Sequence, residues 1–169
     1  MKYKISILSD WHIGSGLSSG AESDANVLKD PDNLPYIPGK TVKGLFKAAL
    51  MEMPLSVVSE IDITRIFESG SIFFSNAYLS KEERDEAKCY NNFLYRKIAY
   101  TSIGENGIAL NHSLRTMEVC IPLVLQGEIT GFCEKKDRIF LEMAAKWIRG
   151  IGVNRNRGMG RCKIQITNK

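Results

Sequence analysis

The sequence predicts one α+β domain in which helices cover one face of an antiparallel sheet. Stretches of alternating apolar and polar residues, typical of half-buried strands, occur near both ends of the chain. Two other stretches carry apolar residues three and four positions apart, as amphipathic helices do. The chain has 169 residues, of which 44% are hydrophobic and 25% charged, so we expect a single globular domain over residues 1–169.

The chain begins with a strand and a long loop. Residues 2–8 alternate, with Tyr3, Ile5 and Ile7 on one face, and predict a half-buried strand. Residues 9–38 are rich in Gly, Ser, Asp, Asn and Pro and show little periodicity. Loops of this length in compact domains are usually functional or disordered. Because this one ends in the stiff segment LPYIPG, we expect a functional loop.

A helix and a second strand complete the first half of the chain. The helix is expected from Lys40, and Pro54 stops it because proline lacks a backbone N–H. Residues 71–79, SIFFSNAYL, predict the second strand. The apolar stripe of the helix consists of Val42, Leu45, Phe46, Ala49, Leu50 and Met53.

The middle of the chain predicts a hairpin inserted between two halves of the sheet. Residues 81–97 hold a short helix or a loop. Residues 98–117 have two extended arms around a Gly-Glu-Asn-Gly turn. Residues 118–132 predict one further strand. The apolar face of that strand carries Val119, Ile121, Leu123 and Leu125.

The last part of the chain predicts a helix over residues 137–149, ended by Gly150 and Gly152, and a strand over residues 161–166. The full order is therefore strand, helix, strand, then strand, helix, strand. This is the ferredoxin-like order, built from two split β-α-β units. The buried stripe of the second helix is expected to consist of Ile139, Phe140, Met143, Ala144, Trp147 and Ile148.

Basic residues are segregated along the chain. The net charge of +4 does not identify a partner by itself. Acidic residues gather in KEERDE, residues 81–86, whereas two other segments are rich in cations. A polyanion-binding surface requires such segregation, although a solvated basic face explains it equally well. The cations are Lys40, Lys43 and Lys47 on one flank of the first helix, and Arg155, Arg157, Arg161 and Lys163 near the end of the chain.

Cysteine usage and hydropathy indicate a reducing compartment. The four cysteines form no C-x-x-C pair and there are two histidines, so we expect no structural zinc site. No apolar run approaches the ~18 residues of a membrane span, and the first apolar stretch is too short for a signal peptide. We therefore predict a cytoplasmic protein with no membrane partner. Buried, apolar-like thiols are expected at Cys89, Cys120, Cys133 and Cys162.

Residues 150–161, GIGVNRNRGMGR, are the main candidate for a phosphate-binding loop. Glycines, Gly158 and Gly160 among them, let the backbone pass close to another group. The interleaved arginines supply planar guanidinium donors suited to phosphate, and backbone N–H groups of such a loop can form an anion nest. The composition favours RNA binding over a flexible connection between helix and strand.

The long loop contains candidates for chemistry. His12 follows the first strand beside Trp11, and a lone histidine is more often structural than catalytic. Residues 30–33, Asp-Pro-Asp-Asn, predict a turn. Asp24 has no such turn role, which leaves it open for chemistry. Tyr36 can stack on a base or be buried.

Two motifs resemble the RAMP superfamily of CRISPR effector proteins. Residues 12–44 contain HIGSG, SDANVLKDP and LPYIPGKTVKG in succession, similar to the N-terminal signature of that family. Residues 152–161, GVNRNRGMGR, are similar to its C-terminal glycine-rich loop. The nearest resemblance is to the repeated backbone subunit of type III (Csm-like and Cmr-like) complexes. It implies a modified RRM-like or ferredoxin-like fold.

The resemblance also implies roles for particular segments. Subunits of that family stack along a CRISPR RNA, and a hairpin thumb from each copy interrupts the guide–target duplex; the corresponding segment here is about residues 96–118. The family pattern D-x-x-V-[IL]-K-D places a target-cleaving aspartate at Asp24. The implied reaction is attack of an RNA 2′-hydroxyl on the adjacent phosphate. A divalent metal ion, Mg or Mn, would bind at Asp24 only with RNA present.

Three functions follow from the resemblance. The first is a target-cleaving endoribonuclease subunit, the second a non-catalytic scaffold that holds guide RNA, and the third an endoribonuclease that processes guide RNA with a His-centred acid–base site. The implied partners are CRISPR RNA, single-stranded target RNA and other effector subunits, with copies of this chain among them. The implied RNA contacts are His12, Lys40, Lys43, Lys47, Arg155, Arg157, Gly158, Gly160 and Arg161.

Overall fold

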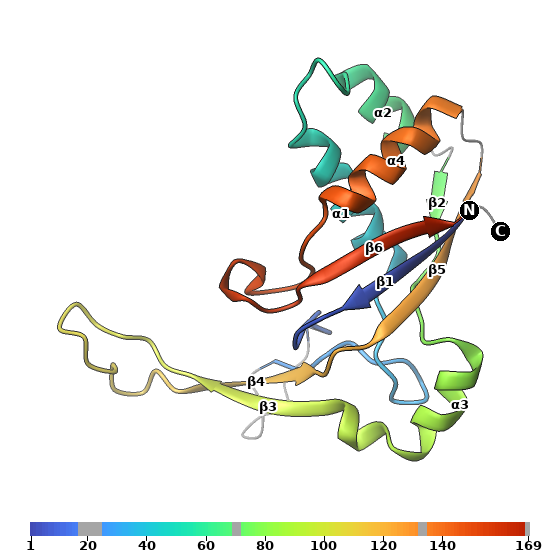
Figure 1. Ribbon diagram of the computed structural model, residues 1–169. Coiled ribbons are helices and arrows are strands. Elements are labelled where there is room, and N and C mark those ends of the chain that lie inside the picture. Colours follow the sequence, from blue (N-terminus) through green and yellow to red (C-terminus); the bar gives the residue numbers. More distant parts are fainter. Residues whose placement is uncertain (17–24, 69–71, 132–134, 168–169) are drawn as a thin grey trace.

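Two layers make up the body of the molecule, a four-stranded sheet and a layer of helices on one of its faces, and a long hairpin projects from it (Figure 1). The computed structural model describes residues 1–16, 25–68, 72–131 and 135–167. Within these ranges no helix is long and apolar enough to cross a lipid bilayer. The elements are β1 (Lys2–Ile7), α1 (Gly39–Met51), α2 (Glu60–Glu68), β2 (Ile72–Phe74), α3 (Lys81–Cys89), η1 (Asn91–Leu94), β3 (Tyr95–Tyr100), β4 (Arg115–Cys120), β5 (Val124–Gly131), α4 (Lys135–Trp147), η2 (Arg155–Arg157) and β6 (Cys162–Thr167).

The sheet is antiparallel throughout, in the order β2-β5-β1-β6. Ile5 of β1 faces Leu125 of β5 on one side and Ile164 of β6 on the other. The apolar residues of β1 are buried and its lysines are exposed, because alternate side chains of a strand point to opposite faces. The strand predicted at residues 2–8 is therefore confirmed.

Helices α1 and α4 pack on the same face of the sheet (Figure 1). The stripe predicted for α1 is confirmed at Val42, Phe46, Ala49 and Leu50, which are all buried. The helix ends at Met51, ahead of Pro54.

The stripe predicted for α4 is wrong in part. Ile139 and Trp147 are 51% and 50% exposed, whereas Leu141 and Ala145 are buried. The buried face is rotated because α4 packs between β6 and α1. Trp147 lies toward α1, where its indole N–H donates to the Glu52 carboxylate at 3.1 Å.

A close backbone approach fixes the start of α1 against β2. A Cβ at Gly39 would lie 2.0 Å from the Phe74 carbonyl oxygen, so only glycine permits this contact. The Gly39 N–H donates to Oδ1 of Asn76 at 2.9 Å, which satisfies one of the unpaired N–H groups at the helix start. The predicted strand at 71–79 is shorter than expected, since only Ile72–Phe74 form β2.

An ion pair with a buried carboxylate joins α2 to α4. Asp137 is 2% exposed and accepts from both terminal nitrogens of Arg65, Nη1 at 2.9 Å. A bidentate guanidinium–carboxylate pair offsets the desolvation of a buried carboxylate better than a single hydrogen bond does.

Strands β3 and β4 form the hairpin expected in the middle of the chain. They pair from Tyr95 opposite Cys120 to Tyr100 opposite Arg115, and a bridge between Ile103 and Ala109 extends the pairing toward the tip. The hairpin extends well beyond the body of the molecule (Figure 1). Large apolar side chains near its tip are exposed, namely Ile103, Ile108, Leu110 and Leu114.

The single strand predicted over residues 118–132 is wrong, because the segment contributes to two different sheets. β4 ends at Cys120 in the hairpin and β5 begins at Val124 in the main sheet. Pro122 lies in the break, where its missing N–H and fixed φ interrupt a continuous ladder. The predicted apolar face is present on both sides of the break, since Val119 and Leu125 are both buried.

The predicted turn at residues 30–33 is confirmed. Oδ1 of Asp30 accepts from the N–H groups of Asp32 and Leu34, at 2.9 and 3.0 Å. Arg84 of α3 then holds the turn through Asp30 and Asp32, each at 2.6 Å.

The cysteines differ from the expectation in one case. Cys120 and Cys162 are buried, and burial raises the pKa of the Cys162 thiol to about 11. Cys89 is exposed at the end of α3, which has no buried residue. Cys133 lies outside the described residues.

Candidate nucleic-acid interface

The glycine-rich loop connects α4 to β6 and presents arginines to solvent. Arg155 and Arg157 lie on the short helix η2 and are exposed. Asn154 and Gly158, which flank η2, both adopt left-handed conformations, with φ of 54° and 89°. Gly158 has open space where a Cβ would be, so its backbone conformation, not its packing, favours glycine there.

Two other glycines seat this loop on the segment that follows β1. A Cβ at Gly152 would lie 2.1 Å from the carbonyl oxygen of His12, and the Val153 N–H donates to that same oxygen at 3.1 Å. The Gly160 N–H donates to the Asp10 carbonyl at 2.7 Å. The two motifs singled out at opposite ends of the sequence therefore form one surface.

Ser9 clamps both sides of the loop. Its hydroxyl donates to the Gly158 carbonyl at 2.8 Å and accepts from the Arg161 N–H at 3.0 Å. Sequence reasoning missed this residue, because its only signal was a small polar side chain just after a strand.

His12 supports the surface from below. Its ring is 3% exposed, and Nδ1 lies 2.7 Å from the carbonyl oxygen of Glu118. Because a carbonyl only accepts, Nδ1 carries a hydrogen and donates it to this oxygen. Nε2 would lie 3.1 Å from a Cβ at Gly14. The structure thus places His12 in the interior, whereas the sequence suggested an RNA contact.

Glu118 of β4 anchors the returning part of the long loop. Its carboxylate accepts from the Val27 N–H at 2.9 Å and pairs with Lys29 at 2.8 Å, and its backbone N–H donates to the Ala25 carbonyl at 2.9 Å. With the contact to His12, these bonds fasten both limbs of the long loop to the base of the hairpin. Nothing in the sequence pattern around Glu118 indicates this role.

A hollow of about 490 Å³ lies between the glycine-rich loop and the hairpin base. Arg96 of β3, Arg157 and Asp10 line it, and Arg96 is paired with Asp10. Tyr100 contacts Met159 of the loop, with the hydroxyl 3.1 Å from Sδ. The hollow is thus open and bordered by guanidinium groups, a shape and charge suited to a phosphate backbone.

The predicted basic residues do not form one continuous patch. A second hollow, of about 510 Å³, brings Arg155 against α1, but its α1 lining consists of Leu45, Ala48, Ala49 and Glu52. By the helical period Lys40, Lys43 and Lys47 lie on a different flank of α1. Lys40 is exposed there, whereas Lys43 and Lys47 are half-buried.

The remaining candidates in the long loop have varied positions. Trp11 is fully buried, with its indole N–H donating to the Ile121 carbonyl at 3.0 Å. Tyr36 stacks on Tyr78, with 5.4 Å between ring centroids. Asp24 lies outside the described residues.

Comparison with known proteins identifies the family. The family model for the RAMP superfamily matches residues 4–163. The chain belongs to the RAMP superfamily. No curated protein sequence matched it.

Two solved structures of the type III-B Cmr-beta complex contain chains with a similar fold. In the cryo-EM structure bound to cognate target RNA, the similar chain is 13% identical, with a TM-score of 0.73 over 97% of this chain and 95% of that one. In the apo state the identity is 12% and the TM-score 0.69, with the same coverage. At this identity the likeness establishes the RAMP fold of the chain.

Proposed function

We propose that this chain is an RNA-binding subunit of a type III CRISPR effector complex, and that its glycine-rich loop holds the phosphate backbone of guide RNA. The observation that carries the proposal is the seating of this loop on the segment after β1, which fixes Arg157 beside the hollow at the hairpin base. Because the backbone that carries these guanidinium groups is already fixed, no loop has to be ordered when they bind phosphate.

Family membership and fold support this proposal. The RAMP family model matches residues 4–163, and one similar chain belongs to a complex bound to cognate target RNA. We therefore propose CRISPR RNA, single-stranded target RNA and other effector subunits, copies of this chain among them, as partners.

The proposal extends to the topology. Leaving out α2, α3 and the hairpin, the chain runs β1-α1-β2-β5-α4-β6 with the sheet order β2-β5-β1-β6. This supports a single ferredoxin-like domain over residues 1–169 in which the β3–β4 hairpin is the inserted thumb.

Target cleavage at Asp24 is the finer part of the proposal. Asp24 is joined directly to Ala25, whose carbonyl is held by Glu118 at the hairpin base. In the proposed reaction the 2′-hydroxyl of the target gives up its proton to solvent as its oxygen attacks the adjacent phosphorus, the 5′-oxygen leaves and takes up a proton, and a cyclic phosphate remains.

Among the described residues, no three His, Cys, Asp or Glu side chains gather into a group that could hold a metal ion. The two carboxylates of the interface, Asp10 and Glu118, are paired with Arg96 and Lys29. The described residues therefore do not fit a preformed cation site, and a divalent metal ion at Asp24 stays a prediction.

The same observation favours a second candidate, a scaffold subunit that holds guide RNA without cutting. Carboxylates that are already paired have less capacity to bind a metal ion or accept a proton. The two candidates differ only in the role of Asp24.

Cleavage of labelled target RNA by the assembled complex separates the two. Asp24→Ala should abolish cutting with guide RNA still bound, whereas Asp85→Ala, on the exposed helix α3, should cut like the wild type. Unchanged cutting by Asp24→Ala would overturn the catalytic part and leave the scaffold.

A further inference from the structure

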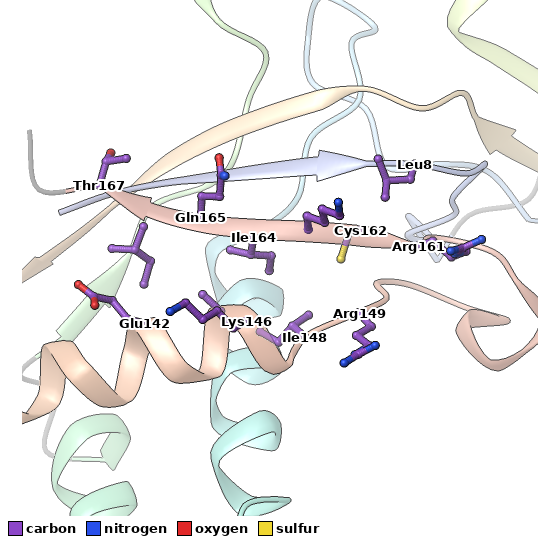
Figure 2. Close-up of a pocket in the computed structure, with 13 residues that line it drawn as sticks. Leu8, Glu142, Lys146, Ile148, Arg149, Arg161, Cys162, Ile164, Gln165 and Thr167 are labelled. Carbon is purple, nitrogen blue, oxygen red and sulfur yellow. The ribbon is translucent and has the colours of Figure 1, made fainter.

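A groove of about 830 Å³ lies between α4 and the outer edge of β6, away from the glycine-rich loop's arginines on η2. Figure 2 shows Cys162 and Ile164 pointing toward α4, while Gln165 and Thr167 point to the opposite side of the strand. All four line the groove, so it surrounds the edge of the strand from both faces.

The edge of β6 has no strand partner within the described ranges, since β6 is the last strand in the order β2-β5-β1-β6. The Leu8 N–H donates to the Arg161 carbonyl at 2.7 Å, so Leu8 and Arg161 are a hydrogen-bonded pair just beyond the ends of β1 and β6. Hydrogen-bonded and non-hydrogen-bonded pairs alternate along two antiparallel strands. The backbone groups of Lys163, Gln165 and Thr167 therefore bond to β1. The N–H and C=O groups of Ile164 and Ile166 therefore point outward.

Two features make this edge suitable for pairing with another strand. It has six residues, whereas the opposite edge strand, β2, has three. Its beginning is already covered, because the outward N–H of Cys162 donates to the Arg149 carbonyl at 2.9 Å. The available stretch is thus the part from Ile164 to Ile166, beside the groove.

The side chains around the groove indicate the chemistry of an occupant. Its apolar lining includes Ile148, which directly follows α4, and Ile164, and these two point toward one another in Figure 2. Lys146 and Arg149 are exposed at the α4 wall, and Arg161 and Lys163 are exposed on the β6 side. Glu142 is the one acidic residue of the lining. No aromatic ring lines the groove, so it offers no platform for RNA bases.

We propose that this groove binds an extended, acidic segment of a partner protein, which adds to β6 as a fifth strand of the sheet. The backbone of the segment exchanges hydrogen bonds with Ile164 and Ile166, as in other cases of strand addition beside a helix. Its alternate apolar side chains enter the groove next to Ile148, and its acidic side chains lie near Lys146 and Arg149. This site is separate from Arg155 and Arg157 of the proposed RNA interface, and Arg161 lies between the two.

The test uses the full chain and a fluorescein-labelled peptide of about eight residues in which glutamate and valine alternate, long enough to cover the edge at ~3.3 Å per residue. Binding is followed by fluorescence anisotropy. Lys146→Glu should weaken binding about tenfold or more, and Lys81→Glu, an equal charge change on α3, should leave it unchanged. Ile166→Pro, which removes an outward N–H, should also weaken it, whereas Ile166→Val should not.

Peptide variants keep the test decisive even where Ile166→Pro fails to fold. Methylation of alternate backbone nitrogens should abolish binding, and replacement of glutamate by lysine should do the same. Equal binding of either peptide would overturn the proposal. Loss of oligouridylate binding, or of self-association, in Lys146→Glu without any peptide binding would instead assign the groove to RNA or to a second copy. Either result leaves the proposed role of Arg155 and Arg157 untouched, because these variants do not alter them.

Discussion

Replacement of Gly152 by alanine should lift the glycine-rich loop off the segment after β1. The new Cβ would start 2.1 Å from the His12 carbonyl oxygen, so the two backbones must separate by about 1 Å, to a distance that real contacts show. That movement breaks the 3.1 Å hydrogen bond from the Val153 N–H to the same oxygen. A left-handed φ of 74° adds a backbone penalty for any residue with a Cβ.

The magnitude follows from these contributions. The left-handed conformation costs about 1–2 kcal/mol, and the lost hydrogen bond about 1 kcal/mol more. Gly158→Ala is the matched control, because Gly158 also has positive φ but open space around its Cβ position. We expect Gly152→Ala to lose roughly twice the unfolding free energy that Gly158→Ala loses.

Urea denaturation of both variants gives the two free energies, and anisotropy with guide RNA gives the affinities. Gly152→Ala should also bind guide RNA more weakly at a temperature where it is fully folded, since Arg157 is no longer fixed beside the hollow. Equal stability losses in the two variants would refute the close seating of the loop.

Other changes test the supporting contacts. Arg65→Ala leaves the buried Asp137 without its guanidinium partner, so we expect the free energy of unfolding to fall by about 3 kcal/mol. Urea denaturation measures this, and a loss below about 1 kcal/mol would contradict the pairing. Glu118→Ala should cost about 2 kcal/mol and Glu118→Gln about half as much, because glutamine still accepts from Val27; equal losses would argue against that bond. In thiol labelling at pH 8, Cys89→Ser should remove a fast-reacting thiol, because Cys89 is exposed. Cys162→Ser should not remove one, since burial raises the pKa of the Cys162 thiol to about 11. Fast labelling of Cys162 would contradict its burial. Side-chain hydrogen bonds from Arg84 and Lys88 lower the pKa of Asp32, so the stabilisation is present at neutral pH and is lost as the pH falls through that lowered pKa. The difference in melting temperature between wild type and Asp32→Asn should therefore shrink on acidification, and a difference that stays constant in acid would exclude the charge as the cause.

The sequence predicted the elements whose signal is local. Alternation identified β1 and β6, the apolar spacing identified α1, and the Asp-rich turn at residues 30–33 was recognised from its composition. The sequence did not predict which sheet each strand joins. Residues 118–132 read as one strand because alternation continues across Pro122, although the two parts join different sheets.

In the candidate site, too, residues with a local sequence signal were predicted and long-range contacts were not. Composition identified the arginines of the glycine-rich loop, and they are exposed as expected. The bonds that fix the loop come from Ser9 and from backbone groups, which carry no distinctive sequence signal. The RNA contact of His12 stays a prediction, and the structure places Nδ1 of its buried ring 2.7 Å from the Glu118 carbonyl oxygen, a contact that the sequence does not indicate.

The lysines of α1 illustrate why segregated charge does not locate a surface. Lys40, Lys43 and Lys47 share a flank as predicted, but residues on another side of α1 face the glycine-rich loop. Which flank of a helix meets a distant loop depends on packing, and the spacing of charges does not reveal it.

The salt dependence of guide-RNA binding by the assembled complex tests the central claim most directly. The account predicts that Arg155→Ala combined with Arg157→Ala weakens binding and lowers the slope of log affinity against log salt by about 1.4, the effect of two lost phosphate contacts to a single strand. The control pair, Lys81→Ala with Lys135→Ala, removes the same charge from exposed positions on α3 and α4 and should leave the slope unchanged. An unchanged slope in the loop variant, or an equal decrease in both, would contradict phosphate binding by the glycine-rich loop.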